Sequence, residues 1–287
     1  MRTVSTSHSS GRPAPKVRPE LRGPRKVEIL LIGRELLSGQ IADGNARHVA
    51  DFFTARGDQV RRVTTVDDDP VRIAGVLREI LGRSPNVLVV TGGLGPTRDD
   101  CTLEAIAEVL GQPLREAAAA RDMVETAYVR MHKARLTDRA GMTVTREKLC
   151  RLPVGTTPVA NPFGVAPGMA ARMPGGTHIF ALPGKPEEMR PMLAAAVDAI
   201  RELAAHGHRA RQEIEAPLPD ESVIAPLLER LSAEFPQVTL TTRTVGSGKK
   251  SARVLITVES VAATPEEANG DVAGTIRRLL AIAGGGG

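Results

Sequence analysis

The sequence is poor in aromatic residues and cysteine, and it has no long hydrophobic run. Only 2% of its 287 residues are aromatic and tryptophan is absent, so the chain offers little surface for stacking on nucleic-acid bases. Two cysteines, Cys101 and Cys150, fit no metal-ligand spacing and are too few for a disulfide framework. No apolar stretch approaches the length of a membrane span, and no secretory segment opens the chain. These absences predict a cytoplasmic protein that binds neither a membrane nor a specific nucleic acid.

The positive net charge does not alter this expectation, because it lies in the N-terminal tail. The formal charge of the chain is +5, and residues 1–26 hold seven Lys or Arg and one acid. The tail therefore sums to +6 and the remainder to −1. Residues 1–25 are rich in Ser, Pro, Gly and Arg with almost nothing to bury, so we expect a disordered basic tail. The last glycines, 284–287, are expected to be flexible.

The most informative stretch is 91–102, which reads TGGLGPTRDDCT and follows the apolar run 87–90. An apolar run bounded by turn residues is typical of a strand buried on both faces, and residues 102–110 read as a helix. Glycines at 92, 93 and 95 can bring bare backbone N–H groups close to a ligand. Asp99 and Asp100 fall in the loop or at the helix N-cap, where exposed amides favour anions. The stretch predicts a phosphate or nucleotide site, although a structural turn with capping aspartates is the open alternative.

Two earlier stretches repeat this order of strand, turn and helix. The predicted strands are residues 27–32, 59–66 and 86–90, and the predicted helices follow Asn45, run over 71–81 and run over 102–110. Asp67, Asp68 and Asp69 precede Pro70, which is typical of a helix start. Strands that alternate with helices predict a doubly wound, mostly parallel sheet, whose ligands bind beyond the carboxyl ends of the strands. We therefore expect the loops at 33–45, 67–70 and 91–100 to converge on one rim.

The rest of the chain predicts a longer α/β domain and a second, smaller one. Residues 103–149 look helical with interruptions near 111–113 and 137–138, and 152–173 is turn-rich and ends in a hairpin. A strand at 178–182 leads through Gly184 and Lys185 into a helix that reaches about residue 205, and Lys185 is a candidate phosphate partner. Beyond it the order is strand, helix, strand, strand, helix, with 245–251 as a hairpin loop. We predict an α/β domain at 26–205 and an α+β domain at 206–283.

Five motifs in this order resemble the CinA family, the competence/damage-inducible protein A family. They are GxELLSG at 33–39, DxN at 43–45, TGGLGPTxDD at 91–100, NxxGxAPG at 161–168 and LPGxPxEM at 182–189. The resemblance covers the family's N-terminal molybdopterin-binding-like domain and, more loosely, the small α+β domain after it. It implies a doubly wound, mostly parallel sheet of the MogA/MoaB type and a homo-oligomer. The family's deamidase domain is expected to be absent.

The resemblance also implies a function, because such family members are similar to metal-dependent pyrophosphatases acting on ADP-ribose. More distant relatives bind or adenylylate molybdopterin, so the expected partner is a nucleotide or pterin phosphate. In the leading hypothesis the glycine loop cradles a diphosphate and Asp100, with Asp99 or Glu35, holds a divalent metal such as Mg²⁺. Asp100 and Asp99 are the predicted catalytic residues, and Asp100 and Glu35 the predicted metal ligands. The predicted substrate-binding residues are Thr91, Gly92, Gly93, Gly95, Thr97, Glu35, Asn45, Asp67, Asn161, Gly184 and Lys185.

One departure from the family pattern keeps other functions open. Where the family commonly has Gly-Asp-Glu, this chain has Gly33, Arg34 and Glu35, so a cation replaces a carboxylate. If that carboxylate normally helps to hold a metal, metal-dependent hydrolysis is not expected here; if it only caps a turn, Arg34 is a candidate phosphate contact. Arg34 thus favours the second hypothesis, a non-hydrolytic pterin or nucleotide-binding module. A third hypothesis, a structural or partner-binding protein, predicts that Asp100→Asn changes neither ligand affinity nor any activity.

Overall fold

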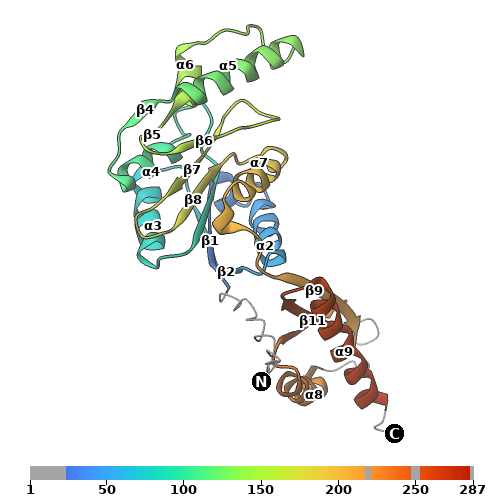
Figure 1. Ribbon diagram of the computed structural model, residues 1–287. Helices are drawn as coiled ribbons and strands as arrows, with labels where there is room; N and C mark the ends of the chain where they lie inside the picture. Colours follow the sequence, from blue (N-terminus) through green and yellow to red (C-terminus); the bar gives the residue numbers. More distant parts are fainter. Residues whose placement is uncertain (1–23, 217–220, 247–252, 285–287) are drawn as a thin grey trace, which may run out of the picture.

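A computed structural model describes residues 24–216, 221–246 and 253–284 of the chain. Its larger unit is built on a six-stranded sheet with the order β2-β1-β3-β8-β7-β6, seen edge-on in Figure 1. The elements up to η2 are β1 (Lys26–Ile32), α1 (Arg34–Leu37), α2 (Asn45–Ala55), β2 (Gln59–Val66), α3 (Pro70–Gly82), β3 (Val87–Thr91), α4 (Thr102–Leu110), β4 (Leu114–Glu116), α5 (Ala118–Lys133), α6 (Val144–Glu147), η1 (Lys148–Cys150), β5 (Arg151–Pro153), β6 (Thr157–Val159), β7 (Gly168–Arg172), β8 (His178–Leu182), α7 (Pro186–Asp198) and η2 (Arg201–Leu203). The expectations for residues 1–23, 247–252 and 285–287 lie outside the described residues.

The sheet confirms the predicted fold class. Strands β2, β1, β3 and β8 run parallel, whereas β7 and β6 join antiparallel at one side. Strand β1 lies between β2 and β3, so the chain leaves β1 toward one neighbour and later returns to its other side. Such a reversal of strand order opens a crevice at the carboxyl ends of the strands. The architecture thus points to the ends of β1 and β3 as the place for a ligand.

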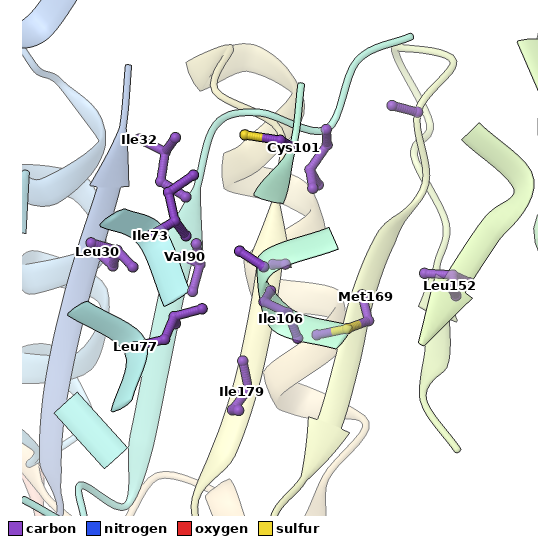
Figure 2. Packing of buried hydrophobic residues seen from close by; sticks show 14 of the residues in the cluster. Leu30, Ile32, Ile73, Leu77, Val90, Cys101, Ile106, Leu152, Met169 and Ile179 are labelled. Carbon is purple, nitrogen blue, oxygen red and sulfur yellow. The ribbon is translucent and has the colours of Figure 1, made fainter. Parts of the chain in front are cut away.

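Helices cover both faces of the sheet because its central strands are apolar on both sides. Every residue of β3 and β8 is buried. One core layer joins β1, β3 and β8 to α3 and α4 through residues such as Leu30, Leu77 and Ile106, and Figure 2 shows this packing. The second layer packs the opposite strand residues against α2 and α7, through Phe53 and Phe180 among others. The alternate use of successive strand residues fixes the register and thereby the positions of the loops at the strand ends.

The smaller unit has its own sheet and its own core. It comprises β9 (His208–Glu215), α8 (Glu221–Glu234), β10 (Val238–Val245), β11 (Arg253–Ala262) and α9 (Pro265–Gly284). The sheet is antiparallel with the order β10-β11-β9. Its separate apolar cluster includes Ile224, Ile256 and Leu279. The order strand, helix, strand, strand, helix is the one that the sequence pattern predicts.

Three details of the larger unit differ from the sequence expectations. Within 103–149 the chain contains a strand that the sequence does not predict, β4, which pairs with β5 more than thirty residues later in the sequence. Helix α7 ends at Asp198 rather than near residue 205, and the chain continues through the short helix η2 to Gly207, whose amide donates to the Arg56 carbonyl. Residues 34–37 form the short helix α1, where the sequence predicts a loop.

None of the helices in the described part of the chain is both long and apolar enough to span a membrane.

Candidate functional site

The loops after β1, β2 and β3 meet at the carboxyl ends of the strands, as the sequence predicts. The Gly33 amide donates to the Val66 carbonyl at 3.1 Å, and the Arg34 amide donates to Asp68 Oδ2 at 2.9 Å. These bonds join the first two loops. Asp69 caps α3 by accepting from the amides of the next turn, so one aspartate of the triplet caps the helix and another ties the loops together.

Gly92 joins the third loop to its neighbours on either side. Its φ is +103°, and a Cβ there would overlap the Ile32 carbonyl oxygen at the end of β1. On the other side the Gly92 amide donates to the Leu182 carbonyl at 3.0 Å, while Thr102 Oγ1 donates to the Gly92 carbonyl at 2.8 Å. Only glycine fits between backbone groups at this distance. The bare backbone of the loop is thus fixed at the switch between β1 and β3.

Asp100 closes the loop on itself and does not cap α4. Its Oδ2 accepts from the Thr97 amide at 2.8 Å and from Thr97 Oγ1 at 2.6 Å. The bare Cα of Gly95 makes room, since a Cβ there would lie 2.5 Å from Oδ2. Among the described residues nothing donates to Oδ1. Asp100 is therefore oriented through one oxygen, while the other has no partner among these residues.

The neighbouring predicted residues have different surroundings. The N-cap of α4 is Cys101, without a side-chain hydrogen bond. Asp99 is exposed and makes no hydrogen bond or ion pair with the residues that the structure describes. Thr91 is buried inside β3 with 2% of its surface exposed, so its side chain does not line an open site. Gly93 is at the pocket described below.

Asn45 ties the β8 loop to the same rim and has an unused acceptor. Its Nδ2 donates to the Gly184 carbonyl at 2.8 Å, and Gly184 lies against Gly92. The Asn45 side chain is buried, yet its Oδ1 has no hydrogen-bond partner in the structure. A buried acceptor without a donor is costly, and ligand-binding sites are where such atoms are expected.

Asp67 gives the opposite end of the rim a second unused acceptor. One carboxylate oxygen, Oδ2, lies 3.3 Å from Arg72 Nη1, whereas Oδ1 is buried without a partner. Asp67 follows β2 and Gly184 follows β8, so three strand spacings, roughly 14 Å, separate the two loops. Asn45 and Asp67 thus place two buried acceptors without donors at separated points beneath the rim.

Asn161 and Lys185 are engaged with Glu188. Asn161 Oδ1 accepts from the amides of Phe163 and Gly164, and its Nδ2 donates to Glu188 Oε2 at 2.7 Å. Lys185 Nζ lies 3.6 Å from Glu188 Oε1 with 73% of the side chain exposed. Asn161 thus orders the turn of its own motif, whereas Lys185 remains accessible from solvent.

A pocket of ≈ 380 Å³ lies on the far side of the glycine loop, between the loop, the start of α4 and the segment 144–151. It shares Gly93, Gly95 and Asp100 with the predicted site. The pocket is also lined by three cationic residues that the sequence analysis does not identify, Arg98, Lys148 and Arg151. No motif marks Lys148, because it reaches the loop only through the fold. The pocket and the rim adjoin the same loop, so we read them as two halves of one site.

The structure argues against Cys101 as a nucleophile. Burial, with the nearby charges of Glu104 and Asp68 added, raises the pKa of the Cys101 thiol to about 11. A thiol is nucleophilic only as the thiolate. Cys101 is 7% exposed and belongs to the apolar core cluster, so it is a packing residue.

This raised pKa predicts slow alkylation of Cys101 in the folded protein. Relative to an ordinary thiol, a pKa two units higher lowers the thiolate fraction roughly 100-fold near pH 8. Iodoacetamide labelling followed by peptide mapping should show little modification at Cys101 near pH 8, and faster modification as the pH approaches the raised pKa. Labelling in denaturant is the control. Equal labelling rates with and without denaturant would contradict the assignment.

The candidate metal ligands do not form a complete metal centre. In the described ranges no group of three His, Cys, Asp or Glu side chains is placed to hold a metal ion. Asp100 keeps one free oxygen, and the Glu35 carboxylate folds back beside Gly33. Mg²⁺ usually keeps several waters and is bound by one or two carboxylates together with substrate phosphates. The described residues thus form no centre that holds a metal through protein ligands alone.

Comparison with known proteins adds four similarities. A family model described as a probable molybdopterin binding domain matches residues 28–202. A protein of Pyrococcus abyssi is 39% identical over 212 residues, which cover 73% of this chain and 82% of that one. A CinA-like protein of Desulfosudis oleivorans is 41% identical over 171 residues, 60% of this chain and 39% of its own length. One solved structure is also similar, that of the protein CinA from Thermoplasma acidophilum, which is described as having unknown function. The match has a TM-score of 0.55 and 34% identity, and it covers 61% of this chain and 98% of that chain.

Proposed function

Because this chain belongs to the molybdopterin-binding domain family and is CinA-like over that domain, we propose that it hydrolyses a nucleotide diphosphate such as ADP-ribose at the 91–100 loop. The observation that carries the proposal is how the Asp100 carboxylate is hydrogen-bonded and where it lies. One of its oxygens is fixed by Thr97, the other has no donor among the described residues, and the carboxylate borders the pocket. A carboxylate held in this way can orient a water molecule or a phosphate-bound cation.

The rim supports a nucleotide or pterin as the ligand. Asn45 Oδ1 and Asp67 Oδ1 are buried without donors, and ribose hydroxyls or the amino groups of purines or pterins would supply donors once the rim opens to admit the ligand. The glycine loop between these acceptors presents backbone to the diphosphate. A Mg²⁺ carried by the phosphates would be held by Asp100 and Glu35, and when bound it neutralises phosphate charge. The homo-oligomer and the cytoplasmic location remain predictions.

Arg34 favours a second candidate, a module that binds a pterin or nucleotide phosphate without hydrolysing it. The Arg34 amide is fixed at the rim by Asp68, and its exposed side chain has no ion pair among the described residues. A guanidinium at this point can bind a phosphate bidentately. It also removes a carboxylate that could help to hold a cation, which favours binding over hydrolysis.

The test is AMP release from ADP-ribose by the purified chain with Mg²⁺, Mn²⁺ or Co²⁺. We expect metal-dependent release that Asp100→Asn lowers by about 10²-fold or more, because the amide neither orients water as a base nor holds a cation. Asp122→Asn, an exposed change on α5, is the matched control and should keep wild-type activity. If AMP never forms while calorimetry shows ADP-ribose or pterin binding, the hydrolase is wrong and the binding module is right.

A further inference from the structure

We propose that Lys148 is a positioning residue that orients Asp100 by closing the turn 97–100 from the pocket side. Its Nζ donates to the Thr97 carbonyl and to the Asp100 carbonyl, both at 2.6 Å. These are the two residues that the Asp100 carboxylate already joins through Oδ2. The turn is therefore held by a carboxylate on one side and by an ammonium on the other. The inference deepens the proposed function and rests on it.

The hydrogen bonds of Lys148 are of a kind that fixes a backbone turn. An ammonium has three N–H donors, and charge-assisted bonds to carbonyls are stronger than neutral ones. Two donors go to the turn, and Glu104 Oε1 lies 3.5 Å from Nζ for the third. The side chain is 28% exposed, so solvent competes only in part. All three donors are directed at the protein, which is why we assign Lys148 a positioning role and not phosphate binding.

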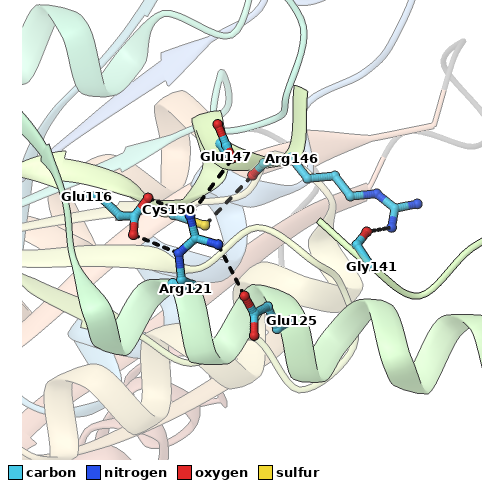
Figure 3. Close-up of polar contacts among 7 residues, drawn as sticks. All are labelled: Glu116, Arg121, Glu125, Gly141, Arg146, Glu147 and Cys150. Atoms are coloured by element: carbon cyan, nitrogen blue, oxygen red, sulfur yellow. Dashed lines mark hydrogen bonds and ion pairs between the residues drawn. The ribbon is translucent and has the colours of Figure 1, made fainter. Parts of the chain in front are cut away.

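The short helix η1 that begins at Lys148 follows Glu147, and Figure 3 shows Glu147 among the contacts of Arg121. Arg121 of α5 binds Glu116 through two bonds of 2.7 Å, reaches Glu125 at 3.2 Å and lies 4.0 Å from Glu147. The residues after Lys148, Leu149 and Cys150, are buried in the core. These contacts hold the backbone at 147–150 in place. The Lys148 side chain therefore extends from an ordered segment to the turn at 97–100.

A neighbouring contact fixes the chain just before Lys148. The Arg146 guanidinium lies 3.6 Å from the centre of the Tyr128 ring, and Arg146 also donates to the carbonyls of Arg139 and Gly141. The segment from α5 to η1 is thus bound together as one unit. Lys148 is the side chain through which this unit bonds to the turn at Thr97 and Asp100.

The test compares Lys148→Met, Lys148→Arg and the control Lys133→Met, an exposed residue at the end of α5. Methionine keeps the length of the side chain and removes its donors. We expect hydrogen–deuterium exchange of the amides in 92–101 to become about tenfold faster in Lys148→Met. Exchange in β8, and in the whole of Lys133→Met, should stay at the wild-type rate. The arginine variant should restore part of the protection, since it keeps a charged donor.

Activity supplies the second readout. With ADP-ribose we expect Lys148→Met to lower kcat about tenfold with little change in KM, because the ligand contacts remain while Asp100 loses its orientation. If the wild type releases no AMP, the proposed hydrolysis fails, and ADP-ribose affinity in calorimetry then replaces kcat as the readout. Unchanged exchange in 92–101 would overturn the proposal whatever the activity. Faster exchange throughout the α/β unit, with unchanged kcat or affinity, would also overturn it, because that result describes a merely structural residue.

Discussion

Gly92→Ala is expected to destabilise the α/β unit by about 3–5 kcal/mol, the sum of a strained backbone and a backbone overlap. The φ of Gly92 is +103°, a conformation that L side chains rarely adopt, and the added Cβ would overlap the Ile32 carbonyl. The residue cannot move away, because its amide is bonded to the Leu182 carbonyl and its carbonyl accepts from Thr102. Urea unfolding followed by circular dichroism measures the loss.

Gly111→Ala is the matched control for this prediction. Gly111 also has a positive φ, +63°, but nothing lies within 4 Å of a Cβ there. The substitution should therefore cost only the left-handed strain, about 1–2 kcal/mol. The difference between the two variants isolates the overlap between the loop and β1. Equal unfolding midpoints would show that the strand ends relax freely and that the loop is not fixed at the switch point.

The sequence predicts the parallel core because each central strand is an apolar run, which indicates a buried strand from local sequence alone. Apolar runs such as 87–90, followed by glycine and then by a helix pattern, are local signals, and the sheet brings their carboxyl ends together by geometry alone. The convergence of the loops after β1, β2 and β3 follows from this rule and is confirmed by the bond from Gly33 to Val66. Local patterns therefore suffice for the position of the rim.

The pocket half of the site could not be predicted in the same way. Lys148 is 48 residues from the Asp100 carbonyl that it binds, and no periodicity or motif links the two. The β4–β5 pair that carries the chain back toward the loop is equally non-local. The side-chain roles within the motifs also depend on the fold, since Asp100 closes its own loop while Asp69, in a similar acidic run, caps a helix. Sequence locates the acids but does not separate these roles.

The second large effect is expected from Asp58→Ala, at the junction between the two units. The Asp58 side chain is fully buried and binds Arg25 through two bonds of 2.6 and 2.8 Å. It also lies 2.8 Å from Nε2 of His206, in the segment that leads from α7 to β9. Removing one partner from a buried ion pair leaves the other charge uncompensated, which costs about 3–5 kcal/mol. Urea unfolding should show a loss of this size.

Asp198→Ala is the control, since it removes the same group from a pair with Arg56 whose carboxylate is 58% exposed. Exposed pairs contribute at most about 1 kcal/mol, so this variant should unfold close to the wild type. Because Asp58 binds residues from the start of β1 and from the segment before β9, its loss should also make the chain near His206 more sensitive to limited proteolysis. Equal stability of the two variants would mean that the junction is held by the backbone bonds from His206 and Gly207 to the Arg56 carbonyl, and that the side-chain cluster around Asp58 contributes nothing further.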